Sequence, residues 1–410
     1  MLHTWMALAL ATGLPGPAGD EWPQLLGPAR NGVARLDGPV GEVSERWRVP
    51  IGSGLSGPVV VSDRVVIFHR KGGDEIVECL EAANGKQRWS MAYPSTYSDS
   101  FGSDDNGPRA TPTVDGGRVF ALGAEGKLHA IDLESGRKLW AVDFRSELSA
   151  PLGYFGFGCS PLVEKDRIVL NVGGENGAGV VALDVSSGKV LWKATDDEAS
   201  YSSPVSMDTP GGRAIVLFTR SGLRLVDPAS GKVRSSFPWR ARIAASVNAA
   251  NPIVAGDQVL LTASYGTGAV LLELKEASAV PVWKSDEAIS AHYATPVFHG
   301  GHLYGFDGRV DSGTPAFRCV ELATGKVKWS RDRFGGGTVL LAGGELVILT
   351  DEGELVIAQA STAGWKELRW KKVLDGPVRA YPAIAGGRLY ARNSGTLVSL
   401  DLKPTPAASK

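Results

Sequence analysis

This chain of 410 residues is built from an internal repeat. Units of about 45 residues follow one another, a period typical of propeller blades and solenoids. Each unit opens with a small or polar residue, a proline and an alternating apolar run. Because proline is tolerated at the first residue of a strand, where its missing N–H need not join the ladder, each proline marks a strand start. The prolines of this series are Pro58, Pro112, Pro161, Pro204, Pro252, Pro296 and Pro382.

The rest of each unit predicts three more strands. Glycine-rich turns such as Asp115-Gly116-Gly117 supply the positive φ that tight hairpins need. A strand ending in a Leu-Asp pair or similar then leads to a turn such as Thr324-Gly325-Lys326, and a tryptophan follows. The 52 glycines, 24 prolines and 11 tryptophans fit four-stranded units with an aromatic side chain on the last strand. Such sheets bury their faces by stacking around an axis, and we expect seven tryptophans in the layers between them: Trp47, Trp89, Trp140, Trp192, Trp283, Trp329 and Trp370.

Counting the units predicts an all-β fold, an eight-bladed β-propeller of four-stranded antiparallel blades. The last unit, residues 380–402, supplies only three strands, and residues 45–49 at the front of the chain carry the missing tryptophan strand. Pairing this N-terminal strand with the last blade closes the ring and removes an exposed edge. Seven blades is the alternative, because three units depart from the pattern: Ser235 stands at a tryptophan position, residues 277–279 replace a Gly-Lys turn, and Thr338 stands at a proline position.

The chain divides into four parts. Residues 1–19 resemble a secretory signal, since an apolar stretch is followed by small and helix-breaking residues. No Lys or Arg precedes that stretch, so a mis-assigned start or a disordered tail is the alternative. Residues 20–43 form a lead segment, residues 44–403 a single propeller and residues 404–410 a polar tail. The signal predicts a periplasmic or secreted bacterial protein; no cysteine offers a lipobox, and we expect no transmembrane segment.

The charge balance gives no reason to expect a nucleic-acid partner. The 43 basic and 44 acidic side chains leave a formal charge of -1. We expect a monomer whose partner is a protein or another polymer.

The three cysteines are predicted to be structural. Cys79 and Cys319 occupy equivalent positions of the repeat, where other units hold Ala130 and Ala182. A small buried side chain explains this slot better than a catalytic or metal-binding thiol. Cys159 lies in a loop, and its role is less well defined.

These motifs resemble the pyrroloquinoline quinone (PQQ)-like β-propeller repeat family, whose unit reads as a proline-started strand, Leu-Asp, Thr-Gly-Lys and Trp. The similarity covers nearly all of the chain after Glu21, and residues 22–32 look like the Trp-Pro-Gln stretch that opens many secreted bacterial members. The family holds quinoprotein dehydrogenases, which bind PQQ and calcium, and non-enzymatic members such as the BamB lipoprotein of outer-membrane barrel assembly. The resemblance therefore implies the fold and leaves the function open.

If the prolines begin the innermost strands, the loops that precede them gather on one face around the axis, where a rigid scaffold can position binding residues. Two of these loops, residues 91–109 and 143–159, are long and aromatic. They suit a sugar, a peptide or a quinone, or else they form a plug over the channel. The arginines of this face either hold a polyanion or pair with nearby carboxylates. The candidate ligand-binding residues are Arg109, Tyr201, Arg242, Asn248, His292, Tyr293, Arg379, Tyr381, Tyr97 and Tyr154.

The sequence offers no catalytic or metal-binding residues that we can name. The six histidines are not spaced for one ion, and Asp104-Asp105-Asn106-Gly107 lacks the ligand spacing of a calcium loop. We therefore expect a non-enzymatic scaffold that binds protein through its loop face, without a cofactor. The alternatives are a PQQ- and calcium-dependent quinoprotein oxidoreductase and a carbohydrate-binding propeller. The family's dehydrogenases look longer, and many carry adjacent cysteines against the quinone, whereas no two cysteines adjoin here.

Overall fold

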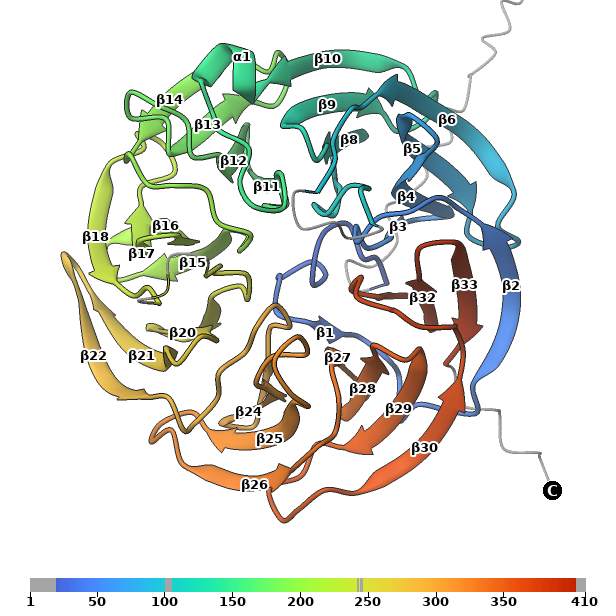
Figure 1. Cartoon of the computed structure of the whole chain (residues 1–410), viewed down its shortest axis with the longest axis vertical. Coiled ribbons are helices and arrows are strands. Elements are labelled where there is room, and N and C mark those ends of the chain that lie inside the picture. Colours follow the sequence, from blue (N-terminus) through green and yellow to red (C-terminus); the bar gives the residue numbers. More distant parts are fainter. Residues whose placement is uncertain (1–19, 100–104, 242, 244–245, 403–410) are drawn as a thin grey trace, which may run out of the picture.

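The structure is a computed structural model that describes residues 20–99, 105–241, 243 and 246–402. Within these residues, eight sheets stand around a central axis, and each supplies four antiparallel strands as the blade pattern predicts (Figure 1). The expected eight-bladed propeller is confirmed, and the seven-bladed alternative is wrong. The signal expected at residues 1–19 and the polar tail at 404–410 lie outside the described residues.

The blades follow the chain in order, and each runs from its inner to its outer strand. The first four are β3 (Val59–Val61), β4 (Arg64–Lys71), β5 (Asp74–Glu81) and β6 (Gln87–Pro94); β7 (Thr113–Asp115), β8 (Arg118–Leu122), β9 (Lys127–Asp132) and β10 (Lys138–Asp143); β11 (Leu162–Glu164), β12 (Arg167–Asn171), β13 (Val180–Asp184) and β14 (Val190–Ala194); and β15 (Val205–Thr209), β16 (Gly212–Thr219), β17 (Gly222–Val226) and β18 (Val233–Pro238). The last four are β19 (Ile253–Ala255), β20 (Gln258–Ala263), β21 (Gly268–Lys275) and β22 (Ser278–Ser285); β23 (Val297–His299), β24 (His302–Asp307), β25 (Ala316–Glu321) and β26 (Val327–Arg331); β27 (Gly337–Ala342), β28 (Glu345–Thr350), β29 (Glu354–Gln359) and β30 (Glu367–Lys372); and β31 (Ala383–Ala385), β32 (Arg388–Arg392), β33 (Thr396–Asp401) and β2 (Ser44–Pro50).

The ring closes as the sequence predicts. The N-terminal strand β2 pairs antiparallel with β33, the third strand of blade eight, with Trp47 opposite Ser399. Figure 1 shows β2 outside β33 at the rim of the ring. Strands from the two ends of the propeller therefore share one sheet, which leaves blade eight with the same four-strand order as the others.

The lead segment lies inside the ring, a position that the sequence does not reveal. Trp22 exchanges backbone hydrogen bonds with Val60 on the inner strand of blade one, at 2.7 and 2.8 Å. Further along, strand β1 (Val33–Ala34) pairs in parallel with β27 and adds a fifth strand to blade seven (Figure 1). The lead therefore crosses the channel from blade one to blade seven. Trp22 and Leu26 are almost completely buried, at 2% and 1% exposure.

Arg30 anchors this lead segment at the axis. Its guanidinium donates to the carbonyl oxygens of Pro204 at 3.0 Å and Ser160 at 3.3 Å, and also to that of Pro161. These carbonyls lie at the inner strand starts of blades three and four. Burial lowers the pKa of Arg30 to about 10. One side chain thus connects the lead to the far side of the ring.

Six of the seven repeat tryptophans lie between blades. Each indole nitrogen donates to a backbone carbonyl of the next blade, and Trp89 Nε1 to Leu133 O at 2.9 Å is an example. The ring of that indole covers the glycine of the next blade's turn, in this case Gly136. The same donation is made by Trp47, Trp140, Trp192, Trp283 and Trp329.

Trp370 corrects the expectation for the seventh tryptophan. Its side chain on β30 is 54% exposed. The other indoles pack on the turn between the third and outer strands of the next blade. In blade eight these strands are β33 and β2, which come from opposite ends of the propeller, so no such turn connects them. The strand pairing that closes the ring therefore leaves blade eight without the turn on which Trp370 would pack.

The slot of Cys79 and Cys319 is explained by the strand register. Cys79 lies opposite Trp89 and Cys319 opposite Trp329, just as Ala130 and Ala182 lie opposite Trp140 and Trp192. A small residue leaves room for the indole that crosses to the next blade. Both cysteines are completely buried, as expected for packing residues.

Candidate functional site

The long connections between blades meet on one face of the ring, which we call the loop face. It carries the segments that join each outer strand to the next inner strand, including residues 95–99 with 105–112, 144–161, 195–204, 239–241 with 246–252, and 286–296. The lead segment enters from the opposite face. There the carboxylate of Glu21 accepts from the backbone N–H of Ser62, and the backbone carbonyl of Asp20 accepts from the N–H of Gly386, both in turns between first and second strands. The loop face is therefore the side on which the connecting loops remain available.

A series of hydrogen bonds from blade to blade lies under the loop face and explains the polar residues that precede most of the prolines. The backbone N–H of one such residue donates to the side-chain oxygen of its counterpart in the next blade. The donations run from Gly57 to Thr111 at 3.0 Å, Thr111 to Ser160 at 2.9 Å, Ser160 to Ser203 at 2.9 Å, Ser203 to Asn251 at 2.7 Å and Asn251 to Thr295 at 2.9 Å. We call this arrangement the preproline ring.

Tyr381 extends the preproline ring past blade seven. Blade seven has no proline-started strand, and the backbone N–H of Thr295 in blade six donates instead to the hydroxyl of Tyr381 in blade eight. Burial raises the pKa of Tyr381 to about 12. Asn248 is also engaged inside the protein, because its side-chain amide donates to Thr219 O at 2.8 Å. The structure therefore places these two candidate residues beneath the loop face, where they hold backbone.

Four candidate residues gather where the two aromatic loops meet. Arg109 pairs with Asp99 at 3.1 Å, and its guanidinium lies 5.6 Å from the centre of the Tyr97 ring and 5.8 Å from that of Phe155. The hydroxyl of Tyr201 accepts from the backbone N–H of Phe155 at 2.7 Å. Tyr97 is only 5% exposed, whereas Tyr154 is 41% exposed. The loops thus pack on each other and present Tyr154 outward.

The loops also carry apolar side chains that are exposed. Leu152 and Ile243 are 39% and 54% exposed, and the guanidinium of Arg220 lies 5.9 Å from the centre of the Tyr154 ring. Arg242, expected beside Ile243, lies outside the described residues. The expectation that arginines pair with carboxylates holds for Arg240, whose guanidinium is 3.7 Å from Glu198.

The remaining candidates lie on blades five to eight. His292 shares a hydrogen bond of 3.0 Å with the hydroxyl of Tyr265, and burial lowers the pKa of His292 to about 4. The hydroxyl of Tyr293 donates to Asp351 at 2.7 Å. Arg379 is exposed. These side chains do not join the cluster around Arg109, so the candidates form separate groups instead of one site.

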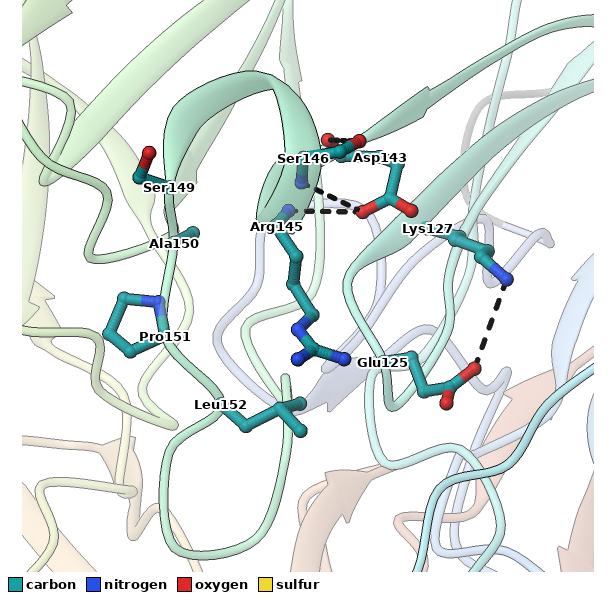
Figure 2. A pocket seen from close by; sticks show the side chains of 9 residues that line it. All are labelled: Glu125, Lys127, Asp143, Arg145, Ser146, Ser149, Ala150, Pro151 and Leu152. Atoms are coloured by element: carbon teal, nitrogen blue, oxygen red, sulfur yellow. Dashed lines mark hydrogen bonds and ion pairs between the residues drawn. The ribbon is translucent and has the colours of Figure 1, made fainter.

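A hollow of about 550 Å³ opens on blade two. It lies between the turn after β8, the end of β10 and the short helix α1 (Phe144–Leu148) with the chain that follows. Its lining residues are Glu125, Lys127, Asp143, Arg145, Ser146, Ser149, Ala150, Pro151 and Leu152. Figure 2 shows the guanidinium of Arg145 and the side chain of Leu152 at this hollow. The sequence treats residues 143–159 as a loop and gives no sign of a hollow there.

No group of three or more His, Cys, Asp or Glu residues in the described part of the chain is arranged to hold a metal ion. Each of the three cysteines is buried and free. Burial raises the pKa of both Cys79 and Cys159 to about 11, so these thiols are held in the protonated form at neutral pH.

A family model described as outer membrane protein assembly factor BamB matches residues 73–331 and 316–404. The chain belongs to this family. The BamB of Moranella endobia is 24% identical over 323 residues, which cover 70% of this chain and 76% of that protein. The BamB of Burkholderia pseudomallei is 26% identical over 256 residues, which cover 60% of this chain and 61% of that protein. The expected relation to the PQQ-like propeller repeats is thereby confirmed.

Solved structures of a BamB and of a methanol dehydrogenase have the same fold as this chain. The crystal structure of BamB from Moraxella catarrhalis matches with a TM-score of 0.65 at 14% identity, over 88% of this chain and all 100% of that one. A europium-containing methanol dehydrogenase matches with a TM-score of 0.69 at 12% identity, over 94% of this chain and 98% of that one. These structural matches establish the architecture of the BamB-family chain. Because the identities are low, its activity has to be argued from its residues.

Among the helices of the described residues, none combines the length and the apolar character that a membrane span requires.

Proposed function

We propose that this BamB-family propeller is a non-enzymatic periplasmic scaffold, which binds a protein of the outer-membrane assembly process through its loop face. Membership of the BamB family supports a role in outer-membrane protein assembly. The observation that carries the binding face is the set of exposed apolar side chains on its loops, Leu152, Tyr154 and Ile243. Apolar groups presented on a rigid ring gain free energy when a partner buries them.

The arrangement of the loops supports binding without a large rearrangement. Tyr154 is carried by a segment whose neighbours Phe155 and Phe157 are held against the protein, Phe155 by Tyr201 and Phe157 by the backbone of Ala124 at 2.9 Å. The exposed ring therefore projects from an ordered support. Preorganisation of this kind reduces the entropy cost of association.

A complementation experiment tests the proposal. In the native organism with the gene deleted, the wild-type gene should restore the amounts of β-barrel proteins in the outer membrane. A Leu152→Ser/Tyr154→Ala variant should restore them poorly while remaining folded. Val280→Ser/Val282→Ser, which changes exposed residues of similar apolar character on the outer strand of blade five, serves as the matched control. Full complementation by the loop variant contradicts the proposed binding face.

The residues fit the PQQ- and calcium-dependent alternative poorly. The three cysteines lie in separate parts of the ring, so no adjacent pair is available to contact a quinone. Arg30 and the lead segment fill the channel at the inner strand starts. Dye-linked alcohol or sugar oxidation measured after addition of PQQ and calcium tests this alternative directly. Turnover in that assay contradicts the non-enzymatic assignment.

A further inference from the structure

The hollow on blade two has a rigid frame. Asp143 caps helix α1 by accepting from the backbone N–H of Arg145 at 3.0 Å and of Ser146 at 3.4 Å, while Glu147 accepts from the backbone of Asp143 at 3.0 Å. Phe144 and Leu148 anchor the helix in the core. The backbone that carries Arg145 is thus fixed at both ends of the helix.

The acidic groups of the hollow are already engaged. Glu125 is 9% exposed and accepts from both the backbone N–H of Thr96 at 3.1 Å and its hydroxyl at 2.6 Å. The carboxylate of Asp143 is used by the helix cap. One oxygen of each carboxylate is thus used within the protein, and the hollow's two acidic residues are matched by two basic ones, Lys127 and Arg145.

The basic groups are available. Lys127 is 3.9 Å from Glu125, at the limit of an ion pair. Arg145 is exposed, and its guanidinium has no hydrogen bond or ion pair with any residue that the structure describes. Figure 2 shows this guanidinium between Glu125 and Leu152. Its fork of N–H donors matches a carboxylate or a phosphate.

Two features of the hollow favour a carboxylate over a phosphate. The buried Glu125 beside the basic groups makes a second negative charge costly, so a monoanion fits better than a dianion. Leu152, which is 39% exposed, and Pro151 give the hollow an apolar wall next to the guanidinium. This wall suits the carbon chain of an acidic residue and an apolar neighbour.

We propose that the hollow is a recognition site for an acidic residue, flanked by an apolar one, in the protein partner. The inference rests on the proposed function and makes it more specific: Arg145, assisted by Lys127, binds the partner's carboxylate, and Leu152 covers the flanking apolar side chain. The hollow and Tyr154 lie on the same loop, residues 149–158, so one bound segment can contact both.

Peptide titration of the full chain tests this site. The probe is the blocked peptide acetyl-Ala-Leu-Glu-Leu-Ala-amide, compared at low salt with the peptide that carries Gln in place of Glu. Wild-type protein should bind the Glu peptide about tenfold more tightly. Arg145→Gln should abolish that preference, and Arg145→Lys should keep part of it. Arg137→Gln, an exposed arginine in the turn on the opposite face of the same blade, should leave it unchanged.

Each contrary result identifies what has failed. Equal binding of the two peptides, or an unchanged preference in Arg145→Gln, overturns the carboxylate site. Competition by inorganic phosphate that exceeds competition by acetate assigns the hollow to a different anion and overturns it too. Neither result affects the outcome of the complementation experiment with the Leu152/Tyr154 variant, which tests the scaffold function separately. Because the Arg145 guanidinium has no hydrogen bond or ion pair among the described residues, its variants should melt at the wild-type temperature, and thermal denaturation verifies this.

Discussion

The indole of Trp89 occupies the space where a β-carbon of residue 136 in the next blade would stand, and its nitrogen donates to Leu133 O at 2.9 Å. Gly136 has a φ of +71°, so the turn needs its left-handed conformation as well as its missing side chain. The turn therefore needs glycine for two reasons, the positive φ and the space taken by the tryptophan of the preceding blade. The same relation joins Trp47 with Gly85, Trp140 with Gly188, Trp192 with Gly231 and Trp283 with Gly325.

Substituting Gly136→Ala should lower the free energy of unfolding by about 3 kcal/mol, since a β-carbon would stand 2.6 Å from the Trp89 ring in an unfavourable backbone conformation. Gly117→Ala is the matched control, because Gly117 has a similar φ of +74° and no atom within 4 Å of the added carbon. It should cost only the backbone part, about 1 kcal/mol. Urea denaturation measures both. Equal losses would mean that the indole moves aside.

The lead segment should contribute strongly to stability. Trp22 is 2% exposed in the channel, whereas Trp370 is 54% exposed at the rim. Trp22→Ala should therefore cost about 3–5 kcal/mol, and Trp370→Ala less than about 1 kcal/mol. Thermal and urea denaturation compare the two variants. A small effect of Trp22→Ala would show that the lead is dispensable for the ring.

The sequence predicts the ring well because each blade repeats the same local requirements. Pro58 and its counterparts start inner strands, the glycines turn hairpins, and the small residue opposite each tryptophan leaves space for the indole. A requirement that recurs is visible as a pattern even when each instance is weak. The closure by β2 could also be predicted, since the last unit lacks a strand that the front of the chain supplies.

Single contacts leave no such pattern. The position of Arg30 depends on carbonyls of blades three and four, which no spacing in the lead segment reveals. Trp370 occupies the right place in the repeat, and only the topology shows that its receiving turn is missing. In the loop face, repeat phase brings Asn248 and Tyr381 toward the axis but does not show that backbone groups already use their side chains. The hollow around Arg145 depends on a helix within a segment that reads as a loop.

The preproline ring predicts a specific effect of Tyr381→Phe. Loss of the hydroxyl leaves the N–H of Thr295 buried without its acceptor, which should cost about 1–3 kcal/mol. Tyr390→Phe is the control: Tyr390 is also buried, at 2% exposure, but no hydrogen bond to its hydroxyl is found among the described residues. The two variants are compared by urea denaturation. Indistinguishable midpoints would contradict a stabilising role of the Tyr381 hydroxyl.

His129 should make the fold sensitive to acid. Its ring is 5% exposed and lies 4.1 Å from the Tyr93 ring, and burial, reinforced by Lys138 and Lys127, lowers its pKa to about 4. The unfolded chain, with an ordinary histidine pKa of about 6.5, binds the proton more readily than the folded chain. The free energy of unfolding is therefore not reduced by His129 above pH 6.5. As the pH drops toward 4, protonation of this residue in the unfolded chain lowers it by about 3 kcal/mol.

The measurement is the difference in unfolding free energy between pH 7 and pH 4.5. This difference should shrink in His129→Gln and stay at the wild-type value in His299→Gln, whose side chain is exposed. Glu75, whose pKa burial raises, shifts stability in the opposite direction. Because Glu75 is present in all three proteins, comparing them isolates His129. If His129→Gln keeps the full wild-type pH dependence, the ring of His129 is protonated in the folded protein without cost.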